Sequence, residues 1–356
     1  MITSNFADGL DAVRYENVAA GKKLSRNPSM SEEDWRWFEL WRGADALSEA
    51  EVEALEQQLR EDPLNMDARV SLFGYFSRYE GNNLKREDAD RKLYEIVLWF
   101  IENKPATTGF LGTRLMGSGR SLKPKTFGAL RQAWLEQVEE FSMDGTVLGN
   151  AGMFIGWNDF ETGSALIERA YELQPAENWL GFFISIIALE LWTSPELYKN
   201  RIREYIIDVG LRSLRTESGG APSMTCQYVS NAALCLGRLD DVRTCIDYLR
   251  KETHPQCDQL ANVYEGLVAL RENKRDCAIG SLLVMKPGYE AQPVAFCLAS
   301  ELFELGERES IVRFIENLGG KIKETDRNRW LEQVAKSERP DFASVFPQLR
   351  RGVRSL

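Results

Sequence analysis

The segment "NAGMFIGWNDFETGSALIERAYELQP", Asn150–Pro175, contains the pattern that decides the fold. It begins with an Asn-Ala pair, four mostly apolar residues and a Gly, and continues with an acidic turn, an amphipathic stretch and a Pro. The segment "NAALCLGRLDDVRTCIDYLRKETHP", Asn231–Pro255, repeats this order. Because glycine favours turns and proline closes helices, each segment predicts a helix, a turn and a second helix.

Two weaker copies of the pattern follow, near residues 264–288 and 298–320. Their turns align with the turn of the Asn231 copy, at Gly237, Asn273 and Gly306, which are 36 and 33 residues apart. A helix–turn–helix unit that recurs at this interval is typical of helical repeat proteins, in which neighbouring units share one hydrophobic core. We therefore expect an array of helix pairs.

The interval and several residues resemble the tetratricopeptide repeat family over about residues 144–318. The resemblance implies a right-handed α-solenoid of stacked antiparallel helix pairs, with irregular repeats. The first turn is about one residue longer than the family's usual turn, and residues 178–222 match the motif poorly. The clearest unit carries the family's Leu-Gly pair, a small residue where two helices cross, an Ala and a closing Pro: Leu148, Gly149, Gly163, Ala170 and Pro175.

The rest of the chain also predicts helices, because no segment alternates apolar and polar residues as a strand does. Ser31 and the Ser48–Glu51 capping box are expected to begin helices. The fold class is therefore all-α. The expected parts are a flexible N-terminal segment 1–30, N-terminal helical pairs 31–105, a Gly-rich basic loop 106–125, a repeat array 126–320, and a capping helix with a basic tail 321–356.

The sequence argues against a nucleic-acid partner and against a membrane span. The net charge is −10, whereas nucleic-acid-binding proteins carry a clustered basic excess. The most apolar stretch, Asn178–Trp192, is short for a membrane span and contains Glu190, so a buried helix is expected. No signal-peptide pattern opens the sequence, and the six cysteines form no CxxC pair. We expect a cytoplasmic protein with reduced, buried thiols; homo-oligomerisation is left open.

No local motif for catalysis is present. The one histidine, His254, precedes Pro255 at the expected end of a helix, a position that suits a turn residue or a contact with the helix dipole. The string Gly112–Gly117–Ser118 faintly resembles a phosphate-binding loop but lacks the lysine that such a loop uses, and no strand leads into it. The pentapeptide Trp-Leu-Glu-Gln-Val occurs at Trp134–Val138 and Trp330–Val334. We interpret the two copies as amphipathic helices whose Trp and Val side chains pack in the same way against neighbouring helices. We expect no catalytic residue, cofactor or metal.

We therefore expect a non-enzymatic adaptor that binds a partner protein or peptide in the concave groove lined by the first helix of each pair. In chaperone-binding members of the resembled family, a groove asparagine and nearby basic residues together hold a carboxylate. The positions of those basic residues are occupied here by Thr146 and Gln227, so binding of a free carboxylate is not expected. The asparagines could instead bond between neighbouring helices, and this alternative stays open. The expected groove residues are Asn150, Met153, Gln227, Asn231, Leu234, Val263, Leu267, Phe296 and Phe303.

Two other functions are compatible with the sequence. The first is an enzyme whose loop at 105–125 covers helix-borne carboxylates near Arg114 or Arg120. The second is self-assembly through the aromatic stripe of Trp35, Phe38 and Trp41 on a short helix. A deep pocket with buried carboxylates near Arg114 or Arg120 would favour the enzyme, and an exposed groove free of paired acids would favour the adaptor.

Overall fold

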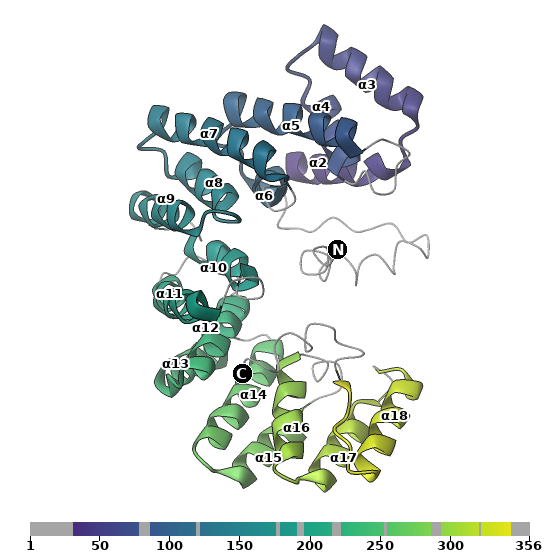
Figure 1. The fold of residues 1–356 in the computed structure, drawn as a ribbon, viewed down its shortest axis with the longest axis vertical. Coiled ribbons are helices and arrows are strands. Elements are labelled where there is room, and N and C mark those ends of the chain that lie inside the picture. Colours follow the sequence, from purple (N-terminus) through teal and green to yellow (C-terminus); the bar gives the residue numbers. More distant parts are fainter. Residues whose placement is uncertain are drawn as a thin grey trace. The chain divides into compact units, whose positions relative to one another are not determined.

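The described part of the chain is all-helical, as predicted. A computed structural model describes residues 31–77, 86–118, 122–175, 179–190, 196–215, 222–252, 255–285, 293–319 and 322–342. These residues form seventeen α-helices, a short 3-10 helix and no strand (Figure 1). No helix among them combines the length and the apolar character needed to cross a membrane. The chain divides into two compact units, Met1–Phe141 and Ser142–Leu356.

Unit 1 is built around α4, which packs against α2, α3 and α5. Every residue of α4 from Ala68 to Phe76 is buried. Both predicted helix starts are confirmed: Ser31 accepts a hydrogen bond from the Asp34 amide, and Ser48 and Glu51 form a capping box. The elements of unit 1 are α2 (Glu32–Gly43), η1 (Ala44–Ala46), α3 (Glu49–Glu61), α4 (Met66–Ser77), α5 (Arg86–Asn103), α6 (Gly109–Ser118) and α7 (Pro124–Glu140).

The prediction of a loop at 106–125 is wrong for its middle part, which forms helix α6. The Phe110 amide donates a hydrogen bond to Asp34 Oδ1 over 2.8 Å, and the Phe110 ring packs against Phe38 and Trp41 of α2. Each helical glycine costs about 1 kcal/mol relative to alanine, so local propensity argued for a loop. The docking of Phe110 onto α2 offsets that cost.

The division between the units also differs from the expected parts. The sequence predicts that residues 126–140 of α7 belong to the repeat array, but α7 packs on α5 in unit 1. The two Trp-Leu-Glu-Gln-Val copies consequently lie in different units, on α7 and α18. Trp134 and Trp330 are both buried, as a shared packing demand requires.

Unit 2 consists of helices that pack on their neighbours in sequence. They pair as α8–α9, α10–α11, α12–α13, α14–α15 and α16–α17, and α18 packs on α17. The first helix of each pair also contacts the first helix of the next pair. The bounds are α8 (Gly145–Ile155), α9 (Phe160–Leu173), α10 (Trp179–Glu190), α11 (Glu196–Arg215), α12 (Pro222–Leu236), α13 (Leu239–Lys251), α14 (Pro255–Arg271), α15 (Arg275–Leu283), α16 (Pro293–Glu304), α17 (Arg308–Asn317) and α18 (Glu324–Ala335).

The turns inside three of these pairs have one geometry. The residue at the aligned turn position has a positive φ in each: 70° at Gly237, 60° at Asn273 and 88° at Gly306. The next amide closes each turn with the long bond of a Schellman motif. These bonds run from Arg238 to Ala233, from Lys274 to Ala269 and from Glu307 to Leu302, over 2.9, 2.8 and 3.1 Å. The repeated turn predicted from residue spacing is therefore confirmed.

The first pair differs, as its sequence indicates. Four residues separate α8 from α9, and Gly156 there has a right-handed helical conformation. At the crossing of these helices, a Cβ atom on Gly163 would lie 2.4 Å from the Gly156 Cα atom. The position therefore requires glycine, which is the packing reason for a small residue there.

Candidate functional site

Most of the groove lining expected from the sequence lies in the core of unit 2. Val263, Leu267 and Phe296 are 0% exposed. The Phe296 ring is enclosed by rings from α17, α18 and the segment after α18. A partner cannot reach these side chains while the helices stay together. Asn150, Met153 and Leu234 are also buried, whereas Gln227, Asn231 and Phe303 are half-buried.

Asn231 forms a bond between neighbouring helices, which is the alternative that the sequence left open. The hydroxyl of Tyr264 on α14 lies 2.9 Å from Asn231 Oδ1 and 3.0 Å from the Gln227 carbonyl oxygen, both on α12. Tyr264 is fully buried, and burial raises the pKa of its hydroxyl well above the ordinary value. The hydroxyl therefore stays protonated and donates to α12.

The aromatic stripe of α2 packs inside unit 1. Trp41 and Phe38 both contact Phe110 of α6, with ring centroids 5.6 and 5.4 Å apart. The Arg114 guanidinium lies 4.3 Å from the centre of the Trp41 ring, where cation–π attraction holds it. The stripe therefore contributes to the unit's own packing, and Arg114 faces aromatic rings.

The remaining residues singled out for chemistry give no site within the described chain. Arg120 and His254 lie outside the described residues. Among the residues that the structure does describe, no group of three or more His, Cys, Asp and Glu side chains could hold a metal ion. All six cysteines are free thiols; four are buried, Cys235 is half-buried, and Cys277 is exposed, contrary to the expectation of uniform burial.

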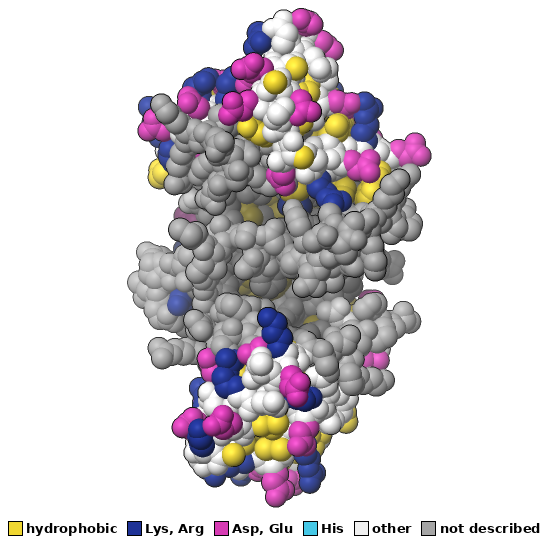
Figure 2. Space-filling model, turned by 90° about the vertical axis from the view of Figure 1, so that its right-hand side faces the viewer, with side chains coloured by type: hydrophobic (Ala, Val, Ile, Leu, Met, Phe, Trp, Pro, Cys, Tyr) yellow, Lys and Arg dark blue, Asp and Glu magenta, His cyan; other side chains and the backbone are white. Residues whose placement is uncertain are grey.

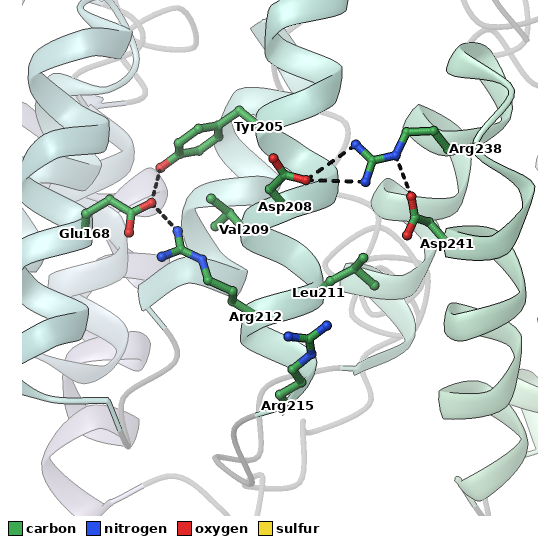
Figure 3. Close-up of a pocket in the computed structure, with 9 residues that line it drawn as sticks. All are labelled: Glu168, Tyr205, Asp208, Val209, Leu211, Arg212, Arg215, Arg238 and Asp241. Atoms are coloured by element: carbon green, nitrogen blue, oxygen red, sulfur yellow. Dashed lines mark hydrogen bonds and ion pairs between the residues drawn. The ribbon is translucent and has the colours of Figure 1, made fainter.

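The candidate site is a polar groove on the second helices of three consecutive pairs (Figure 3). We call it the α9–α11–α13 groove. Its volume is about 560 Å³, within the range of small-molecule sites. Sequence reasoning missed it because the resemblance directed attention to the first helices. The groove is lined by Glu168, Tyr205, Asp208, Val209, Leu211, Arg212, Arg215, Arg238 and Asp241.

One wall of the groove joins α9 to α11 through Glu168. Glu168 Oε1 accepts hydrogen bonds from the Tyr205 hydroxyl, over 3.3 Å, and from the Arg212 guanidinium. The Tyr205 ring packs on Phe160 and Phe183. Burial, and then the Glu168 carboxylate, raise the pKa of the Tyr205 hydroxyl, so Tyr205 acts as a donor and not as a base. The wall holds its charged groups in fixed positions.

The other wall joins α13 to α11 through Arg238, directly after the turn glycine. Arg238 Nε donates to Asp241 Oδ2 over 2.5 Å, and its two terminal nitrogens lie 3.4 and 3.5 Å from Asp208 Oδ1. The Asp241 side chain is 22% exposed, whereas that of Asp208 is 68% exposed. Asp208 is therefore held loosely and remains open to solvent.

Arg215, in the last turn of α11, completes the lining. It is exposed, and Figure 3 shows it without an ion pair, beyond Arg212 and Leu211. Among the described residues, no carboxylate pairs with it. The groove therefore presents two fixed ion pairs, Glu168–Arg212 and Arg238–Asp241, one cation at Arg215, and an exposed anion at Asp208 that has only long contacts with Arg238. This arrangement is suited to binding a charged ligand rather than to transferring protons.

The described surface on the face shown in Figure 2 carries no large patch of only acidic or only basic side chains. Acidic and basic side chains are interspersed there over the described parts of both units, and hydrophobic side chains gather in small groups.

Comparisons with known proteins found no relative: the chain matches no protein-family model, no curated protein and no solved structure.

Proposed function

We propose that unit 2 is an irregular α-solenoid, resembling tetratricopeptide repeats, and that the protein is a non-enzymatic adaptor that binds a partner protein through it. The repeated turn at Gly237, Asn273 and Gly306 and the contacts between successive first helices support the stacked arrangement. Stacking of this kind places equivalent helices side by side and creates extended surfaces for other proteins.

The observation that carries the proposal is the α9–α11–α13 groove. Glu168 is joined to Tyr205 and Arg212 by hydrogen bonds between α9 and α11, and Arg238 bonds to Asp241 beside it and contacts Asp208 on α11. Because these side chains are ordered before a partner arrives, binding loses less side-chain entropy. Arginine and tyrosine, which line the groove, are also enriched among residues that dominate binding energy. We therefore place the partner site on the second helices rather than on the first.

An affinity capture from lysate of the source cells tests this function. The intact chain is compared with Asp208→Arg in the groove and with Arg313→Glu on α17, an exposed residue outside the groove. We expect one protein to be captured by the intact chain and by Arg313→Glu, and to be lost with Asp208→Arg. Calorimetry with the purified partner then measures the loss.

Two other outcomes would change the conclusion. Equal capture by all three proteins would keep the adaptor function and remove the groove as its site. Capture of no protein by any of them, with helicity unchanged by circular dichroism, would contradict the adaptor function.

A further inference from the structure

The open charges of the α9–α11–α13 groove carry an inference about the segment that it binds. Of the three arginines in the lining, Arg212 and Arg238 are already paired with carboxylates inside the groove. Arg215 is not paired with any carboxylate of the described chain. Of the three carboxylates, Asp208 has the longest contacts and the largest exposure. A ligand therefore finds one cation, Arg215, without a carboxylate partner in the described chain, and one anion, Asp208, held only by its long contacts with Arg238.

These two groups lie on one face of α11, because seven residues make about two helical turns. With a rise of 1.5 Å per residue, their Cα atoms are about 10.5 Å apart along the helix axis. Leu211 and Arg212 lie between them on the same face. Leu211 is half-buried, so it offers a small apolar surface between the two charges.

A polyproline II segment matches this spacing. It has three residues per turn and a rise of about 3.1 Å, so residues three positions apart project from one side and are about 9 Å apart. A basic residue can then reach Asp208 while the acidic residue reaches Arg215.

We propose that the groove binds an extended segment of the partner protein in which a basic and an acidic residue stand three positions apart, with an apolar residue between them. The basic side chain pairs with Asp208, the acidic side chain pairs with Arg215, and the apolar side chain packs on Leu211. The inference rests on the proposed adaptor function and names the chemistry that the partner must present.

Synthetic peptides test the spacing directly. The probes are fluorescein-labelled, C-terminally amidated peptides in which one Lys and one Glu stand from one to six positions apart in a Gly-Ser background. The central probe is Lys-Pro-Leu-Glu. Fluorescence anisotropy with the full chain at low salt gives the dissociation constant of each. We expect the tightest binding at a spacing of three, about tenfold tighter than at spacings of one or six, because only that spacing lets both charges pair.

Charge reversal separates recognition from folding. Arg215→Glu is expected to weaken binding of the Lys-Pro-Leu-Glu probe by about tenfold or more, and to bind Lys-Pro-Leu-Lys more tightly than the intact chain does. The matched control Arg313→Glu makes the same charge change on α17, outside the groove, and is expected to bind as the intact chain does. Circular dichroism and thermal unfolding check that both variants stay folded. A merely structural role for Arg215 would not exchange the preference between the two probes.

Several results would overturn the inference: no probe binding to the intact chain, affinity independent of spacing, or equal affinity for the intact chain and Arg215→Glu. If a lysate partner is lost with Asp208→Arg while the probe series fails, the adaptor function stands and this segment chemistry is wrong. Failure of both experiments contradicts the adaptor function itself.

Discussion

The first and second helices of the pairs in unit 2 differ in how they meet solvent. In α16, every residue from Val294 to Ser300 is buried. In α13, the buried residues follow one stripe at helical spacing, and charged residues cover the other faces. A first helix packs on its own partner and on the first helices before and after it. This difference shows that shared repeat geometry does not by itself decide which helix remains available to a partner.

The comparison also separates two kinds of polar contact. Between first helices, the Tyr264 hydroxyl reaches α12 from a fully buried position. Between second helices, Glu168, Arg212 and Arg238 make ion pairs that remain partly exposed. Buried hydrogen bonds hold the core in register, whereas partly exposed pairs shape a surface at little energetic cost.

The largest expected effect comes from truncating the same residue type on the two kinds of helix. Leu267→Ala on α14 removes a side chain that is 0% exposed, and we expect a loss of about 2–5 kcal/mol. Leu211→Ala on α11 removes a half-buried side chain, and we expect a loss below about 1 kcal/mol because no enclosed cavity forms. Urea unfolding measures both. Equal losses would contradict the proposed distinction between the helices.

A glycine-to-alanine substitution tests how closely the first and second helices of a pair cross. Gly163 lies at such a crossing, and Gly280 serves as the control. Gly163→Ala places a methyl group 2.4 Å from the Gly156 Cα atom, so the helices must separate, and we expect a loss of about 1–3 kcal/mol. Gly280→Ala on α15 meets no atom within 4 Å and should stabilise by up to about 1 kcal/mol, through helix propensity. Thermal unfolding compares the two. An unchanged Tm for Gly163→Ala would show that α8 and α9 pack less closely than described.

Removing one hydroxyl tests the contact between first helices. Tyr264→Phe deletes the donor to Asn231 and Gln227, and we expect a loss of about 1–2 kcal/mol because the two acceptors on α12 lose a fully buried donor. Tyr248→Phe, on the half-buried side of α13, is the matched control and should change stability by less than about 0.5 kcal/mol. A stability ranking in the opposite order would argue against the buried bond.

The smallest effect concerns an exposed ion pair near a repeated turn. Lys274 and Arg243 hold the pKa of the Glu272 carboxyl below its ordinary value. A lowered carboxyl pKa stabilises the folded state above the unfolded pKa, and this contribution is lost as pH falls through the folded pKa. The intact chain should therefore exceed Glu272→Gln in stability at pH 7, and the difference should shrink at pH 3. Urea titrations at both pH values check this; a difference that grows on acidification would contradict the sign.

Some features follow from local chemistry, and the sequence was sufficient for them. The turns at Gly237, Asn273 and Gly306 need residues that tolerate positive φ, and the Ser48–Glu51 capping box closes within one helical turn. The small residue at Gly163 was also predictable, because it belongs to a motif with a packing reason. Each depends on residues close together in the chain, so spacing alone reveals it.

Other features depend on residues far apart in the chain, and only the tertiary structure decided them. Helix α6 forms because Phe110 docks on α2, seventy-six residues after its hydrogen-bond partner Asp34. The α9–α11–α13 groove exists because Glu168, Asp208 and Arg238 come from three separate hairpins. The amino-acid sequence by itself determined the all-helical class and the repeated turn, which are local. The tertiary structure decided which helix faces are covered and which charges stay open, because burial depends on every neighbour at once.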